Sequence, residues 1–133
     1  GPGQIRGLTI SPNGRTLAFG YCPPGGPDRL VLLPAQGGEL RDIATGTFTE
    51  IAWMPQTDAL LAYGSPDGQE TMEVFFVDLS AGDLEPIGIS GDDLSLTMDV
   101  HPDGDRIAYN SGRPGSELWV MENFLPAGGE GGP

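Results

Sequence analysis

An internal repeat constrains the fold of this 133-residue chain more than any other feature. A proline-containing turn followed by an apolar run occurs three times, at residues 11–19, 54–63 and 101–109, and its prolines are spaced by 43 and then 47 residues. We align the second copy with one extra turn residue and without the turn glycine. A second motif recurs downstream, at 38–43 and again at 82–87. Two motifs in the same order at one period indicate a repeat architecture.

The repeated turn has residues suited to reversing the chain. Proline fixes φ near −65° at the start of a tight turn, and the Asn-Gly or Asp-Gly pair that follows it can take positive φ. The predicted turn residues are Pro12, Asn13, Gly14, Pro55, Pro102, Asp103 and Gly104. Periodic turns also account for the 22 glycines and 13 prolines, a content that would otherwise point to disorder.

Short apolar runs flank the turns and predict strands. Alternation of large and small residues has a period of two, and we find no convincing period of 3.6. The expected strands are 5–10, 16–21, 29–33 and 40–44 in the first repeat, 48–53, 59–63, 73–77 and 84–89 in the second, and 94–100, 106–110 and 117–121 in the third. Four antiparallel strands in 43 to 47 residues correspond to one propeller blade.

The third copy carries a family resemblance. Its run HPDGDRIAY at 101–109, followed by GSELWVM at 115–121, resembles the PD40 (WD40-like) repeat of TolB-like β-propellers, and the resemblance covers roughly residues 5–125. It implies an all-β fold of about three four-stranded antiparallel blades, half of a six-bladed propeller. It says less about function, because such propellers serve as periplasmic scaffolds, as sensor or effector domains beside kinases, and as lid domains of prolyl-oligopeptidase-like peptidases.

We divide the chain by these repeats. Residues 1–3 are interpreted as a tag scar, since Gly1-Pro2 matches the remnant of a protease-cleaved purification tag, so the natural protein could extend beyond both ends. Residues 4–126 form three blades, at 5–46, 47–91 and 92–126, the last without a clear outer strand. Residues 127–133 form a glycine-rich tail that is not expected to add to the core.

Three blades do not make a usual propeller, which has four to eight. They would leave apolar blade faces open at both ends, and such patches normally find a partner. We expect two chains to close a six-bladed ring as a homodimer with two-fold symmetry. The alternatives are a propeller fragment of a larger hydrolase, sensor kinase or TolB-like protein, a complementary fragment from another polypeptide, an engineered propeller-assembly piece, or three blades that close alone.

The charge of the chain excludes some partners. The net charge is −13 and lysine is absent. Residues 1–45 have a net charge of +1, whereas residues 46–133 have −14. A strongly acidic chain repels phosphate backbones and anionic lipid, so we predict no nucleic-acid partner and no membrane partner.

The sequence offers little for catalysis. The single histidine, His101, occupies the turn position of Ser11 and Met54, and there is no second histidine and no G-x-S-x-G motif. We therefore predict a non-enzymatic protein with no cofactor. The single cysteine, Cys22, lacks an adjacent basic residue in the sequence and is expected to be an unreactive free thiol.

Clustered carboxylates raise a calcium hypothesis. Asp99, Asp103 and Asp105 lie close together in the sequence, and Ca²⁺ favours such oxygen ligands. Their spacing does not complete an EF-hand, however, and Asp103-Gly104 is also the pair that the turn requires. We predict no metal site here.

Binding is expected in the loops, because loops on a rigid scaffold usually carry function. The candidate loop residues are Pro23, Pro24, Asp67, Gly68 and Arg113, and a protein or peptide is a candidate ligand. The first strands would line a central channel with Arg6, Thr9, Thr49, Glu50, Thr97 and Asp99. Trp53 and Trp119 lie within strand runs, so we expect core packing for both.

Overall fold

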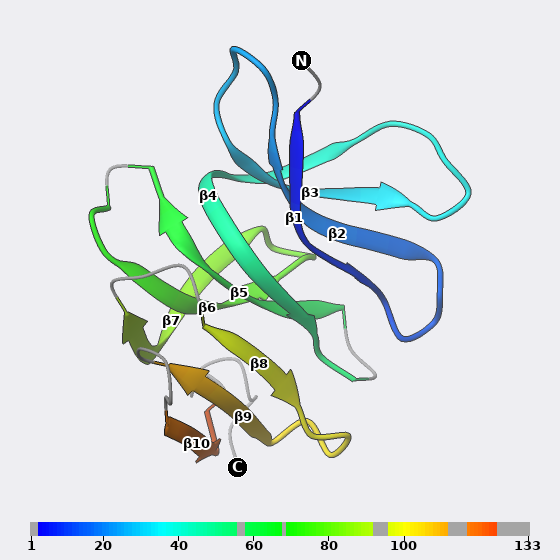
Figure 1. Ribbon diagram of the computed structural model, residues 1–133. Helices are drawn as coiled ribbons and strands as arrows, with labels where there is room; N and C mark the ends of the chain where they lie inside the picture. Colours follow the sequence, from blue (N-terminus) through cyan, green and yellow to red (C-terminus); the bar gives the residue numbers. More distant parts are fainter. Residues whose placement is uncertain (1–2, 56–57, 68, 92–95, 112–116, 125–133) are drawn as a thin grey trace.

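The computed structural model describes residues 3–55, 58–67, 69–91, 96–111 and 117–124, and its ten regular elements are all β-strands (Figure 1). They are β1 (Gln4–Ile10), β2 (Thr16–Cys22), β3 (Arg29–Pro34), β4 (Arg41–Trp53), β5 (Ala59–Pro66), β6 (Met72–Asp78), β7 (Asp83–Gly91), β8 (Thr97–Val100), β9 (Arg106–Ser111) and β10 (Glu117–Glu122). The predicted all-β class is therefore confirmed.

Strands β1 to β7 form one antiparallel sheet and β8 to β10 form a second, and each strand pairs with its neighbour in sequence except at the step from β7 to β8. A change of partner within β4 divides the larger sheet, which gives three twisted meanders. Blade one consists of β1, β2, β3 and the beginning of β4, and blade two consists of the remainder of β4 with β5, β6 and β7. Blade three contains β8, β9 and β10 in the described part of the chain.

The long strand β4 joins blades one and two. Its residues up to Thr45 pair with β3, and those from Gly46 onward pair with β5. The sequence suggested two separate strands here, at 40–44 and 48–53, whereas the structure has one strand of 13 residues. Gly46 lies at the change of partner with φ of 131°, and a Cβ there would come within 2.4 Å of the Ser65 carbonyl oxygen. A side chain at this position would therefore disturb the connection.

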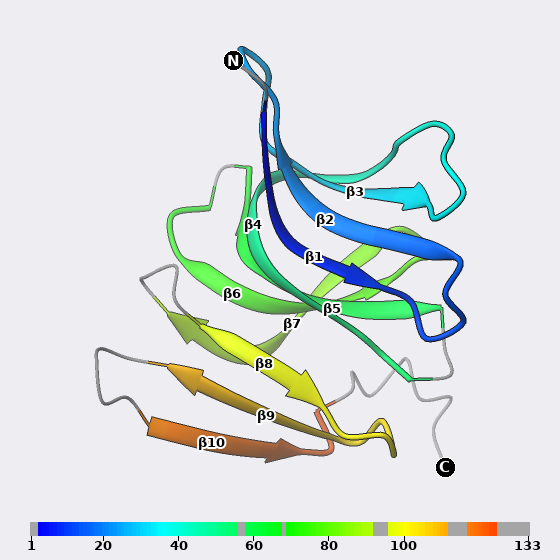
Figure 2. The same ribbon diagram turned by 45° about the vertical axis from the view of Figure 1, so that its right-hand side comes forward.

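The three blades are arranged in the same way, with their first strands side by side and their corresponding turns at the same end. Strand β1 packs beside β4, and β4 packs beside β8, so the first strands of successive blades are neighbours. Figure 2 shows the β1–β2, β4–β5 and β8–β9 turns at one end of the blades, with the β2–β3 and β5–β6 connections at the other. This is the arrangement of consecutive propeller blades.

The strand register corrects our alignment of the repeats. Ile10 pairs with Leu17, Trp53 with Leu60, and Val100 with Ile107. The amides of Ser11, Met54 and His101 each donate to the carbonyl oxygen five residues later, at 2.8, 3.0 and 2.8 Å. The three turns are equally long, so the extra residue that we assigned to the second turn was wrong. The alignment was misled because Ala62-Tyr63 resembles Ala18-Phe19 by residue type but lies one position further along the strand.

The corrected register gives each blade two distinct faces. We call the face toward the preceding blade the upstream face and the face toward the following blade the downstream face. Between blades one and two, Ala18, Leu30 and Leu32 of the downstream face form a buried cluster with residues of the upstream face of blade two, which include Phe48, Ile51, Leu60, Ala62, Phe75 and Val77. We call this contact the first junction.

The second junction joins blades two and three. The downstream face of blade two contributes Leu61, Tyr63 and Val74, which are at most 1% exposed. The upstream face of blade three contributes buried Ile107, with Met98, Val100, Tyr109 and Met121 packed against the cluster. Each fully buried side chain of this size contributes roughly 1.5–3 kcal/mol relative to exposure. The junctions therefore hold the core of the molecule.

Candidate functional site

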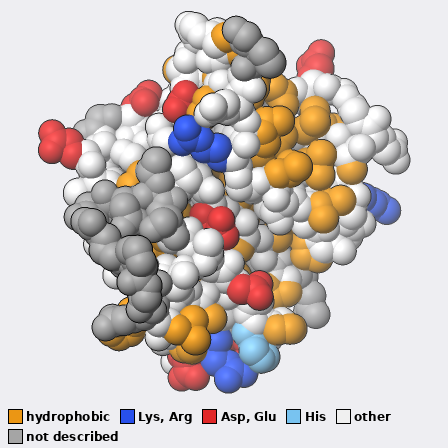
Figure 3. All heavy atoms as spheres, in the orientation of Figure 1, with side chains coloured by type: hydrophobic (Ala, Val, Ile, Leu, Met, Phe, Trp, Pro, Cys, Tyr) orange, Lys and Arg blue, Asp and Glu red, His pale blue; other side chains and the backbone are white. Residues whose placement is uncertain are grey.

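The upstream face of blade one has no covering blade in the described structure. Its inner strand presents Ile5, Leu8 and Ile10, which are 55, 59 and 51% exposed. By strand register these three correspond to Phe48, Ile51 and Trp53 of blade two, and the first two of those are only 1 and 5% exposed. Figure 3 shows hydrophobic side chains gathered over the region of β1 to β3. Two of these three strand positions are thus buried in blade two, while all three are more than half exposed in blade one.

The downstream face of blade three is the second open face, since no other described blade packs on it. Leu118 and Val120 on β10 are 75 and 63% exposed. Their counterparts on β3 of blade one, Leu30 and Leu32, are 0 and 6% exposed because blade two covers them. Two hollows of about 350 and 280 Å³ on this face are both bordered by Ala108 and Asp99.

The two open faces match the two halves of the first junction. Ala108, Leu118 and Val120 stand at the positions of Ala18, Leu30 and Leu32. On blade one, the upstream residues Leu17, Val31 and Leu33 stand at the positions of Leu60, Phe75 and Val77. Apolar residues therefore recur at the positions that form the first junction, although Val31 is smaller than its counterpart Phe75 and is itself buried.

The polar residues predicted to line a channel lie on the inner strands β1, β4 and β8, and their role in a channel stays a prediction. Arg6, Thr9, Thr49 and Glu50 are partly buried on β1 and β4, whereas Thr97 and Asp99 on β8 are exposed. The Met98 amide donates to Glu50 Oε2 at 3.4 Å, which links blades two and three. Burial raises the pKa of Glu50, and this hydrogen bond opposes the rise.

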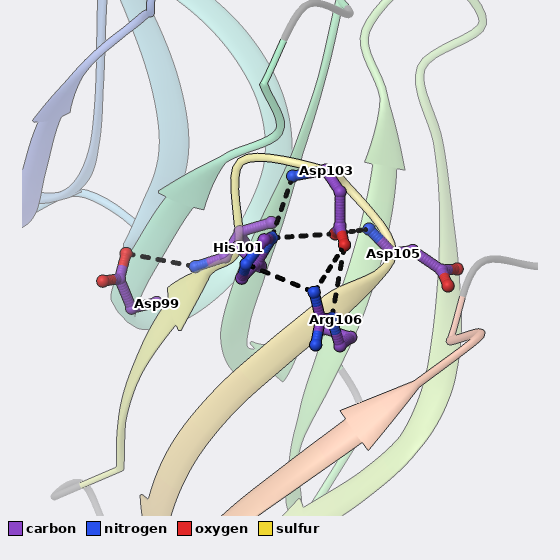
Figure 4. A network of polar contacts seen from close by, with 6 residues as sticks. Asp99, His101, Asp103, Asp105 and Arg106 are labelled. Atoms are coloured by element: carbon purple, nitrogen blue, oxygen red, sulfur yellow. Dashed lines mark hydrogen bonds and ion pairs between the residues drawn. The ribbon is translucent and has the colours of Figure 1, made fainter.

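The β8–β9 turn holds two of the three carboxylates of the calcium hypothesis (Figure 4). Asp103 accepts hydrogen bonds from the Asp105 amide at 2.9 Å and from Arg106 Nη2 at 2.9 Å, and its own amide donates to His101 Nδ1 at 3.1 Å. The hydrogen bond from the Asp105 amide, together with Arg106 and His101, lowers the pKa of Asp103. In the part of the chain that the structure describes, no three His, Cys, Asp or Glu residues are grouped so as to hold a metal ion.

The predicted binding loops are described only in part. Pro23 and Pro24 lie in the β2–β3 connection, and Asp67 follows β5, where its amide donates to the Thr45 carbonyl oxygen at 3.1 Å. Gly68 and Arg113 lie outside the described residues. Cys22, at the end of β2, is partly buried, and this burial, followed by nearby Asp28, raises the pKa of the thiol.

The two tryptophans differ in how far they are exposed to solvent. Trp53 is partly buried and packs against the first junction. Trp119 is 49% exposed, so the expectation of core packing was wrong for it. Its counterpart Phe75 has β7 beside its strand, whereas β10 is the last strand of its sheet among the described residues. An edge position explains the exposure of Trp119.

A cleft of about 600 Å³ lies between blades one and two at the end that carries the β1–β2 and β4–β5 turns. Ser11, Thr16 and Arg41 line one side, and Trp53, Asp58 and Ser80 line the other. Arg41 Nη2 donates to the Leu79 carbonyl oxygen at 2.9 Å across it. We did not predict this site, because its residues come together only when two blades pack and no motif marks them.

Comparison with known proteins places the fold among propellers. A TolB-type protein from Agrobacterium tumefaciens matches with a TM-score of 0.69 and 24% identity over 87% of this chain, and TolB from Acinetobacter baumannii with 0.71 and 19% over 90%. A prolyl endopeptidase matches with 0.65 and 12% over 91%. No protein-family model and no curated protein matches the sequence. The expected resemblance to TolB-like propellers is confirmed at the level of the fold.

The chain spans only part of these structures. It covers 42% of the Agrobacterium protein, 30% of the Acinetobacter TolB and 20% of the prolyl endopeptidase. Ten antiparallel strands over such a share agree with a propeller fragment. The structure has no helix, within the residues it describes, with the length and hydropathy to cross a membrane.

Proposed function

We propose that the chain is a non-enzymatic binding and assembly module, and that two copies close a six-bladed ring. In the proposed dimer, the downstream face of blade three packs on the upstream face of blade one of the second copy. Two-fold symmetry makes this contact twice. The observation that supports the proposal is the equivalence of each open face to a face that is buried inside the same chain.

The physical reason for association is the exposed apolar surface. Ile5, Leu8 and Ile10 at one end and Leu118 and Val120 at the other are each more than half exposed. Covering such residues removes apolar area from water at roughly 25 cal/mol per Å² before the cost of association. A closed ring would also place the β2–β3 and β5–β6 connections of both copies on one side, where a protein or peptide could bind.

Light scattering on the purified chain tests the proposal. We expect twice the mass of one chain at micromolar concentration, and the mass of one chain for Val120→Glu, which puts a charge on the open face of blade three. Leu40→Glu is the matched control, because Leu40 is exposed but lies outside both open faces, between β3 and β4. A wild-type chain that stays monomeric at these concentrations would contradict the ring.

A second reading is favoured by the partial coverage of the matched structures. Here the chain is a propeller fragment of a larger hydrolase, sensor kinase or TolB-like protein, or an engineered piece, and the missing blades cover the open faces. This reading predicts a monomer whose mass is unchanged by Val120→Glu. It also predicts that adding the missing blades in the same polypeptide protects both open faces from solvent.

A further inference from the structure

The cleft between blades one and two is large enough for a ligand. Its volume of about 600 Å³ lies within the range of roughly 300–1,000 Å³ that is usual for small-ligand sites. It belongs to one chain only, because all the residues that line it come from blades one and two.

The equivalent space between blades two and three holds a side chain of the protein itself. Phe124 follows β10, is 4% exposed, and belongs to the same buried cluster as Met54 and Ala59. Asn123 has φ of 54°, in the left-handed region that asparagine tolerates, and this conformation redirects the chain after β10. The second junction is therefore closed at this end by an aromatic residue.

The hydrogen bonds show which residues are equivalent. The Asn123 amide donates to the Asp105 carbonyl oxygen at 3.0 Å, as the Leu79 amide donates to that of Asp58 at 3.1 Å. Ser80 in the cleft therefore stands where Phe124 stands in the second junction. By the turn register, Ser11 likewise stands where Met54 stands. The cleft exists because two small serines replace a phenylalanine and a methionine.

The lining defines the chemistry of an occupant. Leu32, Leu79 and the Trp53 indole supply apolar walls, and Arg41 and Asp58 add one positive and one negative charge. This balance does not select a strongly charged ligand, and it suits the neutral N–H and C=O groups of a peptide. We infer that the cleft binds a peptide segment through one large aromatic or aliphatic side chain, in the way that the second junction holds Phe124.

A synthetic peptide with the sequence of residues 120–126 is a direct probe, because it contains Phe124 in its own sequence context. The Trp119→Phe protein leaves Trp53 as the single tryptophan of the chain, so its fluorescence reports on the cleft. We expect a saturable change with this peptide, and at least tenfold weaker binding of a peptide with alanine in place of Phe124. Absence of any saturable change up to about 1 mM peptide would overturn the inference.

A cleft-filling variant locates the binding. In Trp119→Phe, the added Ser80→Phe should occupy the cleft from within and abolish peptide binding. Ser90→Phe should leave binding unchanged, because Ser90 is an exposed residue of β7 outside the cleft. Equal binding by the Ser80→Phe protein would contradict a site in this cleft. Thermal melting of each variant verifies that it is folded.

Peptide binding in the cleft does not depend on the proposed ring. Since the cleft lies within one chain, adding Val120→Glu to the Trp119→Phe protein should leave its affinity for the peptide unchanged, whatever the mass of the protein. Loss of binding in that variant, with the fold intact, would contradict a site confined to one chain. A monomeric wild type that still binds the peptide would refute the ring alone.

Discussion

Blade two is packed on both faces, whereas blades one and three are each packed on one. The difference does not arise from the kinds of residue at these positions. Leu30 is fully buried and its counterpart Leu118 is 75% exposed, although both are leucines on the third strand of a blade. Blades one and three therefore each present apolar residues, at positions that are buried in an internal junction, on a face that no described blade covers.

The largest difference in the free energy of unfolding is expected between shortening a buried leucine and shortening its exposed counterpart to alanine. Leu30→Ala should lower the free energy of unfolding by about 3 kcal/mol, because it leaves a cavity in the first junction. Leu118→Ala, made in the monomeric Val120→Glu background, should change it by less than about 0.5 kcal/mol. Urea unfolding of both variants in that background checks this. Similar losses for the two leucines would show that the open face of blade three is packed within one chain.

The next largest difference is expected between Gly20, where the backbone of blade one closely approaches blade two, and its counterpart Asn110 on the open face. A Cβ at Gly20 would lie 2.1 Å from the Phe48 carbonyl oxygen, so Gly20→Ala must push blade two away. We expect a loss of about 2 kcal/mol in the free energy of unfolding. Its open-face counterpart, Asn110→Ala, should lose less than about 1 kcal/mol, from its hydrogen bonds with Thr97 alone. A Gly20→Ala protein as stable as the wild type would contradict the tight packing of this junction.

The strands of each blade follow from the sequence, whereas their exposure depends on which blades pack together. The strands were predictable because Pro12 and Pro102, each with a following Gly, mark turns between runs of period two. The strand register of the second repeat was not predictable, because its residue types match those of the other repeats better when the alignment is shifted by one position. Trp119 is exposed because β10 is the edge strand of its sheet among the described residues, and no local sequence pattern indicates this.

The cleft was beyond prediction for a related reason. It depends on Ser11 and Ser80, which are far apart in sequence and unremarkable individually. That these serines leave space for a cleft is evident only when they are compared with Met54 and Phe124 at the equivalent positions. This comparison requires the strand register of all three blades. The candidate loops, by contrast, follow from composition alone, and they remain a prediction.

The folding stability of the protein should depend on pH through the ionisation of Glu50 at the second junction. Burial raises the pKa of Glu50 above the usual 4.5, so the folded protein holds this proton more tightly than the unfolded chain. Stability contributed by the protonated form is therefore lost as pH rises from 4.5 through the folded pKa. Glu50→Gln should raise the melting temperature at pH 7, and the difference should vanish at pH 4. An equal difference at both values would contradict this assignment.

The smallest effect is expected at the exposed β8–β9 turn. The pKa of Asp103 lies below the usual 3.8, chiefly because the Asp105 amide donates to its carboxylate. The stability that this provides is present above pH 3.8 and is lost as pH falls through the folded pKa. An NMR titration should find the midpoint of Asp103 below 3.8, and Asp103→Asn should barely change the melting temperature at pH 7. A midpoint at or above 3.8 would contradict the hydrogen bonding of this turn.

In the proposed ring unlike faces meet, because blade three of one copy packs on blade one of the other. Mixing two variants tests this packing, with Ile10→Glu disrupting only the face of blade one and Val120→Glu only the face of blade three. Each variant alone retains no intact pair of faces, so light scattering should show monomers, while the mixture recovers one intact contact and should contain a heterodimer. A dimer formed by either variant alone, or a mixture that stays monomeric while the wild type dimerises, would contradict the account.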